Sequence, residues 1–172
     1  TQTLDVIVQP FLPKNRKPSI SLFKVNPAGD KKAQSFLINV KWQAYDSDED
    51  GLSFQLFFKE KNDSEWLPLT DKMYEDNFGL DSRVLPDGEY QLKLAVSDDL
   101  TNTPDEAEMT EEISQTFMID NTAPALKILN TQKVGEFIRI EGVFADETSS
   151  VGRAYYSVNA DKWLYFLPRD GI

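Results

Sequence analysis

The sequence predicts an all-β chain that contains one complete antiparallel β-sandwich followed by part of a second one. Two observations favour this fold class. Apolar and polar residues alternate with a period of two in several runs, which is typical of strands with one buried face. A similar order of strands also recurs 100 residues further along the chain. With 172 residues, 40% of them hydrophobic and 27% charged, the chain can form one large domain or two small ones.

The predicted strands begin with four alternating runs, over residues 35–45, 52–59, 90–97 and 113–119. In each run the apolar side chains share one face. They are Phe36, Ile38, Val40, Trp42 and Ala44; then Leu52, Phe54, Leu56 and Phe58; then Tyr90, Leu92, Leu94 and Val96; and finally Ile113, Phe117 and Ile119. Polar residues such as Asn39, Gln55 and Lys93 fall on the opposite face. This asymmetry indicates antiparallel sheets that each pack one face onto a core.

Turn residues separate these runs. Asp50-Gly51 lies between the first two, and Pro86-Asp87-Gly88 precedes the third. The acidic stretch 104–112 lacks an apolar stripe, so we expect a solvated loop there. Near the N-terminus, Leu4, Val6 and Val8 alternate in a further strand.

An internal repeat appears when the chain is shifted by 100 residues, so that Ile38 falls on Ile138 and Asp46 on Asp146. Trp66-Leu67 then matches Trp163-Leu164 after a turn that is three residues shorter. We therefore expect an N-terminal strand and linker over 1–17, a complete module over 18–121, and the first half of a second module over 122–172. The second copy holds counterparts of only the first three or four strands, so we expect further residues or a partner strand to complete it.

Four segments resemble known module families. Trp42 lies in the second strand, and Leu85-Pro86-Asp87-Gly88-Glu89-Tyr90 is similar to a tyrosine corner. Residues 119–124 look like an inter-module junction, and residues 156–163 look like the hairpin that follows one. Residues 18–172 thus resemble tandem fibronectin-type-III and bacterial immunoglobulin-like modules, as found at the tail of large secreted bacterial β-propeller or multi-module proteins. The resemblance implies spacers, adhesion units or accessory domains, with the Tyr90 ring in the core and its hydroxyl bonded to backbone.

Composition excludes several chemistries. The chain has no cysteine and no histidine, which removes zinc fingers, disulfides, redox dithiols and histidine-dependent nucleophilic units. A formal net charge of −11 argues against nucleic-acid binding, and no apolar run approaches the roughly 20 residues of a membrane helix. No glycine-rich phosphate loop is present, and the many carboxylates single out no glycosidase pair. We therefore expect no enzymatic activity.

The sharpest motif is Asp46-Ser47-Asp48-Glu49-Asp50-Gly51, in which alternate aspartates precede a glycine as in oxygen-ligand Ca²⁺ loops. The flanks are strands, and Phe57 stands where an EF-hand has its twelfth-position glutamate. In a sandwich this loop shares a pole with the loop that carries Asp98, Asp99 and Asn102. The candidate Ca²⁺ ligands are Asp46, Asp48, Asp50, Asp98 and Asp99. The alternative is an exposed acidic turn whose aspartates bond their own backbone.

Two further surfaces are candidates. Asp120 and Asn121, with Asp146 and Glu147, would form a junction Ca²⁺ site, or simply a polar linker. Phe57, Trp66, Tyr74 and Phe78 would form an aromatic platform for sugar, or fill the core and cover a sheet edge.

These observations predict a non-catalytic interaction or spacer module of a larger secreted, periplasmic or cell-surface protein. The alternatives are a carbohydrate-binding accessory domain and a Ca²⁺-dependent adhesion module, with Ca²⁺ as the sole candidate cofactor. The expected partners are neighbouring domains of the parent protein and, beyond them, protein or glycan. The chain starts at Thr1 without an initiator Met or a signal peptide, which suggests an excised or processed chain.

Overall fold

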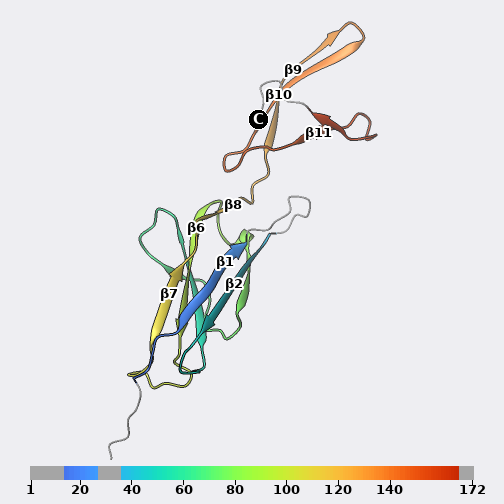
Figure 1. Ribbon diagram of the computed structural model, residues 1–172. Coiled ribbons are helices and arrows are strands. Elements are labelled where there is room, and N and C mark those ends of the chain that lie inside the picture. The colour runs from blue at the N-terminus through green and yellow to red at the C-terminus, as the bar shows by residue number, and fades with distance from the viewer. Residues whose placement is uncertain (1–13, 27–35, 167–172) are drawn as a thin grey trace, which may run out of the picture. The chain divides into compact units, whose positions relative to one another are not determined.

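The computed structural model describes residues 14–26 and 36–166, and these residues are almost entirely strands and turns. The predicted strand at Leu4–Val8 lies outside the described residues. The strands are β1 (Ser19–Asn26), β2 (Leu37–Tyr45), β3 (Ser53–Glu60), β4 (Leu67–Pro68), β5 (Asn77–Asp81), β6 (Gly88–Ser97), β7 (Met109–Ile113), β8 (Phe117–Ile119), β9 (Ala125–Val134), β10 (Phe137–Ala145), β11 (Ala154–Tyr156) and β12 (Leu164–Phe166) (Figure 1). The one helical element in the described ranges is the 3₁₀ turn Ser82–Val84. This confirms the predicted all-β class.

The chain divides into two compact units. The first contains residues up to Leu80 together with Tyr90–Phe117, and the second contains Asp81–Glu89 together with the chain from Met118 onward. Their boundary at Met118 therefore falls directly before the junction that the sequence indicates at residues 119–124, and the segment Asp81–Glu89 groups with the second unit.

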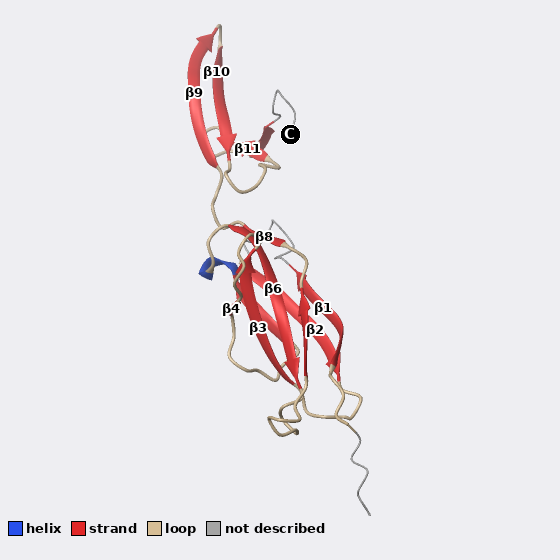
Figure 2. Ribbon diagram, turned by 90° about the vertical axis from the view of Figure 1, so that its left-hand side faces the viewer, coloured by secondary structure: helices blue, strands red, loops and turns tan. Residues whose placement is uncertain are grey.

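The first unit holds two antiparallel sheets. One has the order β1-β2-β5, and the other has the order β4-β3-β6-β7, with β8 pairing with β6. Figure 2 shows β3 and β6 side by side. The longest of these pairings in the second sheet joins β3 and β6, from Ser53 opposite Ser97 to Glu60 opposite Tyr90. A ring contact of 5.6 Å between Trp42 on β2 and Phe54 on β3 connects the two sheets across the core.

The core follows the predicted alternation. On β2 the residues Ile38, Val40 and Trp42 are buried, with Trp42 only 1% exposed, while the residues between them face solvent. On β6 the buried partners are Leu92, Leu94 and Val96. Burying an aliphatic side chain of this size stabilises a fold by about 1.5–3 kcal/mol, so these two strands supply much of the hydrophobic driving force.

Two details of the sequence-based prediction are wrong. Ile113 is 53% exposed rather than buried with Phe117 and Ile119. The run breaks after Ile113 because the Ser114 hydroxyl accepts the Leu92 N–H (3.0 Å) while the Ser114 N–H donates to the Leu92 carbonyl (2.8 Å). The Ser114 hydroxyl oxygen thus accepts a hydrogen bond from β6 at a position where a backbone carbonyl normally accepts it. This interruption separates β7 from β8.

The second error concerns the acidic stretch 104–112, which is not a loop throughout. Its last four residues belong to β7, whose register against β6 runs from Lys93 opposite Ile113 to Ser97 opposite Met109. β7 is an edge strand, which pairs with β6 on one side and has no neighbouring strand on the other. Edge strands commonly carry charged side chains, so an acidic segment without an apolar stripe can still form one.

The described chain after β8 forms two hairpins. Strands β9 and β10 pair across a tight turn at Gly135, whose φ of 63° suits glycine, and β11 pairs with β12. β10 (Phe137–Ala145) starts and ends 100 residues after β2 (Leu37–Tyr45), as the internal repeat predicts. Large apolar side chains lie on the surface of these hairpins: Phe137 is 79% exposed and Trp163 is 69% exposed. That 122–172 is half of a sandwich stays a prediction.

Candidate metal site at the acidic pole of the first unit

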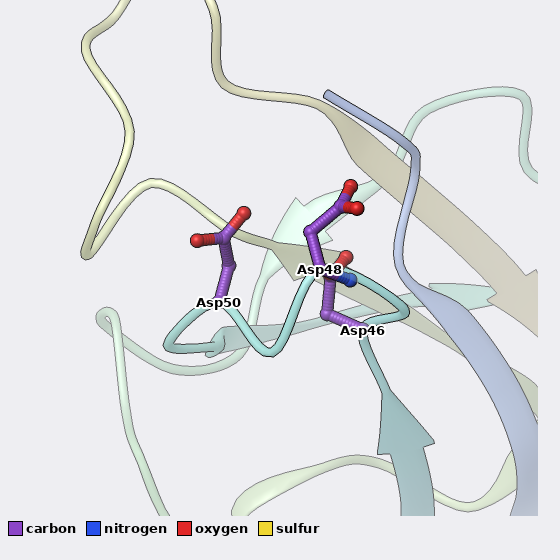
Figure 3. Close-up of side chains that lie close together, drawn as sticks. All are labelled: Asp46, Asp48 and Asp50. Carbon is purple, nitrogen blue, oxygen red and sulfur yellow. The ribbon is translucent and has the colours of Figure 1, made fainter. Parts of the chain in front are cut away.

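The loop after β2 folds so that its alternate aspartates lie on one side. The Asp46 Oδ1 accepts the Asp48 N–H at 2.7 Å, and the Glu49 N–H donates to the Asp46 carbonyl at 3.3 Å. Glu49 then takes a left-handed conformation, with φ of 65°, which turns the chain back toward β3. Figure 3 shows the carboxylates of Asp46, Asp48 and Asp50 directed to the same side of the loop.

These three carboxylates are close enough to share one cation. One oxygen from each lies within 4.8 Å of the others. Two oxygens on opposite sides of a Ca²⁺ ion are about 4.6–5.2 Å apart, since each Ca–O distance is about 2.3–2.6 Å. In the part of the chain that the structure describes, this is the sole group of three or more acidic side chains that meets this distance.

Asp46 differs from its two neighbours in its burial. The residue is 8% exposed, and its Oδ2 is buried without any hydrogen-bond partner. An unpaired polar atom in this position costs a fold about 1–3 kcal/mol, and more when it carries charge. The Asn15 Oδ1 is a second buried oxygen without a partner at this pole.

The two acidic loops meet at this pole, as the sandwich prediction requires. Asp50 connects them, because its Oδ1 accepts the Thr101 hydroxyl at 2.9 Å and its Oδ2 accepts the Asn102 amide at 2.9 Å. The Thr101 hydroxyl in turn accepts the Gly51 N–H at 3.2 Å. Asp50 therefore holds the first loop against the second.

Asp98 is fully buried, and its carboxylate organises the second loop. Its Oδ1 accepts the Glu108 N–H at 2.7 Å, and its Oδ2 accepts the Asn15 side-chain amide at 2.7 Å. Because the Asn15 amide also donates to the Glu106 carbonyl at 2.9 Å, one carboxylate joins both ends of the loop to the segment before β1. Asp98 is outside the group of three that could share a cation.

The Asp99 carboxylate bonds to Ser53 and Lys72 and does not join the group of three aspartates. Its Oδ1 accepts the Ser53 hydroxyl at 2.7 Å, and its Oδ2 lies 2.5 Å from the Lys72 ammonium group. The hydrogen bond from Lys72, followed by that from Ser53, lowers the pKa of Asp99 below the ordinary value of 3.8. Of the five aspartates in the predicted site, the structure thus brings Asp46, Asp48 and Asp50 together and leaves Asp98 and Asp99 outside this group. Protein donors also bond to Asp48 and Asp50, and the Asp46 Oδ2 is the carboxylate oxygen left buried without a partner.

Sequence reasoning did not find the residues before β1 that cover this pole. The Arg16 guanidinium donates to the Asp48 Oδ1 through Nε at 3.0 Å and through a terminal nitrogen at 2.5 Å, and the Arg16 N–H donates to the Asp48 Oδ2 at 3.0 Å. Hydrogen bonds from Arg16 lower the pKa of Asp48, and the same pair raises the pKa of Arg16. The available signal was the basic run Lys14–Lys17, which is complementary in charge to the acidic loops.

The candidate junction site has a different arrangement. The Asn121 side chain donates to the carbonyls of Ser82 (3.0 Å) and Leu85 (3.1 Å), and its oxygen accepts the Ser82 hydroxyl at 2.7 Å. The Asp146 Oδ1 accepts the N–H groups of Thr148 and Ser149. Asn121 thus holds its segment against the turn at residues 82–85, whereas Asp146 bonds within its own loop. In the described part of the chain, no group of three or more acidic side chains forms around either residue.

Lysine ammonium groups lie over two of the four rings of the candidate sugar platform, Phe57 and Trp66. The Lys93 ammonium group lies 4.8 Å from the centre of the Phe57 ring and 5.6 Å from that of Trp66, and Lys59 lies 5.3 Å from Trp66. Tyr74 is exposed, while Phe78 is only partly accessible. Cation–π contacts thus take up the ring faces on which a sugar would stack.

Comparisons with protein-family models, with curated proteins and with solved structures find no significant match to this chain. The described residues contain no helix of the length and apolar character that a membrane crossing needs.

Proposed function

We propose that this chain is a non-catalytic spacer and interaction module of a larger secreted, periplasmic or cell-surface protein. The observation that carries the proposal is the strand order of the first unit, β1-β2-β5 in one sheet and β4-β3-β6-β7 in the other. This order is the one expected for a fibronectin-type-III-like sandwich. A second β unit follows in the same chain, which supports an arrangement of modules in tandem.

A spacer must resist extension, and the first strand is positioned to do this. β1 pairs with β2 in antiparallel register from Ser19 opposite Tyr45 to Asn26 opposite Asn39. The Thr110 hydroxyl on β7 also donates to the Pro18 carbonyl at 2.6 Å, directly before β1 begins. Tension on the N-terminal side therefore has to shear a ladder of backbone hydrogen bonds before the core opens.

The proposal is tested by stretching the whole chain between tethers at its two ends in a single-molecule force experiment. We expect one cooperative unfolding event for the first unit, with a length gain of about 35 nm, because about 100 residues extend by up to 3.3–3.6 Å each. Val25→Pro should lower the force of this event, since proline has no backbone N–H and its fixed φ disturbs the pairing of Val25 with Val40. Val25→Thr is the matched control that keeps the donor. Gradual extension without a force peak would contradict the spacer function.

The two alternatives differ in their support. A carbohydrate-binding role is not favoured, because Lys59 and Lys93 lie over the Trp66 ring. Ca²⁺-dependent adhesion is favoured by one specific observation, the buried and unpaired Asp46 Oδ2, and it requires first that the pole binds the ion.

A further inference from the structure

We propose that the loop between β2 and β3 binds one divalent cation through Asp46, Asp48 and Asp50, and that Ca²⁺ is the ion it fits. The inference goes beyond the spacer function, which does not depend on a bound ion. It also restricts the site to three of the acidic residues of this pole and leaves Asp98 and Asp99 as structural groups.

The unpaired oxygen of Asp46 is the first argument. Its other oxygen already accepts the Asp48 N–H, and this bond fixes the carboxylate in the loop while the Oδ2 stays buried and without a donor. Burying a charged oxygen in this way is unfavourable unless a positive charge lies next to it. The positive charge of Arg16 acts on Asp46 only through space and gives its Oδ2 no hydrogen bond. A cation shared with Asp48 and Asp50 supplies a direct partner, because one oxygen from each of the three carboxylates lies within 4.8 Å of the others.

The chemistry of the donors identifies the ion. The group of three offers only carboxylate oxygens, and the chain contains neither the histidine nor the cysteine that zinc and other transition metals prefer. Ca²⁺ accepts irregular sets of six to eight oxygens at about 2.3–2.6 Å, with water among them. Mg²⁺ requires about 2.0–2.1 Å in near-octahedral geometry, so oxygens that are opposite each other must approach to about 4.2 Å.

Arg16 sets a limit on the affinity. Its guanidinium already pairs with Asp48, and the Asp48 carboxylate has lone pairs enough to accept both an arginine and a metal ion. The neighbouring positive charge opposes a second cation, so we expect weak binding, with a Kd on the order of 10⁻⁴–10⁻³ M as in extracellular modules. Such a site is filled where free Ca²⁺ is in the millimolar range.

The test is a titration of the whole chain with CaCl₂, followed by calorimetry and by thermal unfolding. At about 10 mM Ca²⁺ we expect the unfolding midpoint to rise by roughly 5–10 °C, from the mass-action stabilisation of a domain of this size. MgCl₂ at the same ionic strength should give less than half of this rise. Asp46→Asn removes the unpaired carboxylate oxygen and should abolish the response. Asp48→Asn should do the same, and keeps the test valid if the first variant fails to fold.

Asp63→Asn is the matched control, because it removes the same charge from an exposed position on the β3–β4 connection. It should keep the full response to Ca²⁺. The proposal is overturned if the unaltered chain shows no heat of binding and no rise in midpoint at 10 mM Ca²⁺ (about ten times the weakest expected Kd). It is equally overturned if Asp46→Asn and Asp48→Asn respond as Asp63→Asn does, or if Mg²⁺ acts as strongly as Ca²⁺.

Discussion

Replacing Asp98 by alanine should destabilise the first unit by about 3–6 kcal/mol, although Asp98 lies outside the group of three that could share a cation. The side chain is fully buried and accepts two hydrogen bonds of 2.7 Å, from the Glu108 N–H and from the Asn15 amide. A hydrogen bond to a charged group contributes about 1.5–3 kcal/mol, so the loss of two amounts to about 3–6 kcal/mol. That is a large share of the 5–15 kcal/mol that typically stabilises a domain.

Asp98→Asn should cost roughly half as much. The asparagine oxygen can still accept the Glu108 N–H, whereas its amide group would face the Asn15 amide and leave two donors opposed. Urea unfolding measures both costs, with an unchanged slope showing that the same surface is exposed. Asp105→Ala is the control, since it is an exposed aspartate of the same loop and should change the unfolding free energy by less than about 0.5 kcal/mol. A cost below about 1 kcal/mol for Asp98→Ala would refute this account of the loop.

Four further predictions concern the core, a turn, the acid limit and the cation site. Leu92→Ala should cost about 2.7–5 kcal/mol in urea unfolding because Leu92 is fully buried, whereas the exposed Leu126→Ala should cost less than about 1 kcal/mol. Ala160→Gly should stabilise the β11–β12 hairpin by about 0.5–1 kcal/mol, because Ala160 has a φ of 58°; faster amide exchange in β11 and β12 would contradict this. Asp81 and Asp99 have pKa values below 3.8, that of Asp81 at about 2, owing to hydrogen bonds from Arg83 and Lys72 respectively. The stability that these two carboxylates contribute to the fold is present above about pH 4 and is lost as the pH falls toward 2. The thermal unfolding midpoint should therefore drop over that interval, and an unchanged midpoint would be evidence against this contribution. Arg16→Gln should tighten Ca²⁺ binding about threefold to tenfold in calorimetry, since it removes a positive charge that pairs with Asp48; weaker binding would mean that Arg16 supports the site instead.

The alternation of residues predicted the strands with one regular buried face and missed the irregular ones. β2 and β6 alternate without interruption and were predicted closely. β1 was not singled out, because Leu22 and Phe23 are adjacent apolar residues that break the alternation. In the structure, the register of β1 against β2 also shifts between Ile20 and Leu22. β5 buries only Leu80, which is too few residues to show a period.

The candidate site was predictable only where it is local. The spacing of Asp46, Asp48 and Asp50 in one short loop reveals their proximity directly. Asp98 and Asp99 were treated alike in the prediction, yet neighbouring residues at the end of a strand point to opposite sides, so one is buried and the other pairs with Lys72. The pairing of Arg16 with Asp48 spans 32 residues, and no local pattern indicates contacts of that kind.

The three tryptophans of this chain lie in three different environments, so their fluorescence responds to different events. Trp42 is inside the core of the first unit, so its emission should shift to longer wavelength when that unit unfolds. Trp163 is 69% exposed in the folded second unit and should contribute an almost constant background. Trp66 has two ammonium groups over its ring, which makes its fluorescence sensitive to salt even while the fold is intact. A single emission spectrum therefore separates loss of the first core from changes in charge at the surface, without any added label.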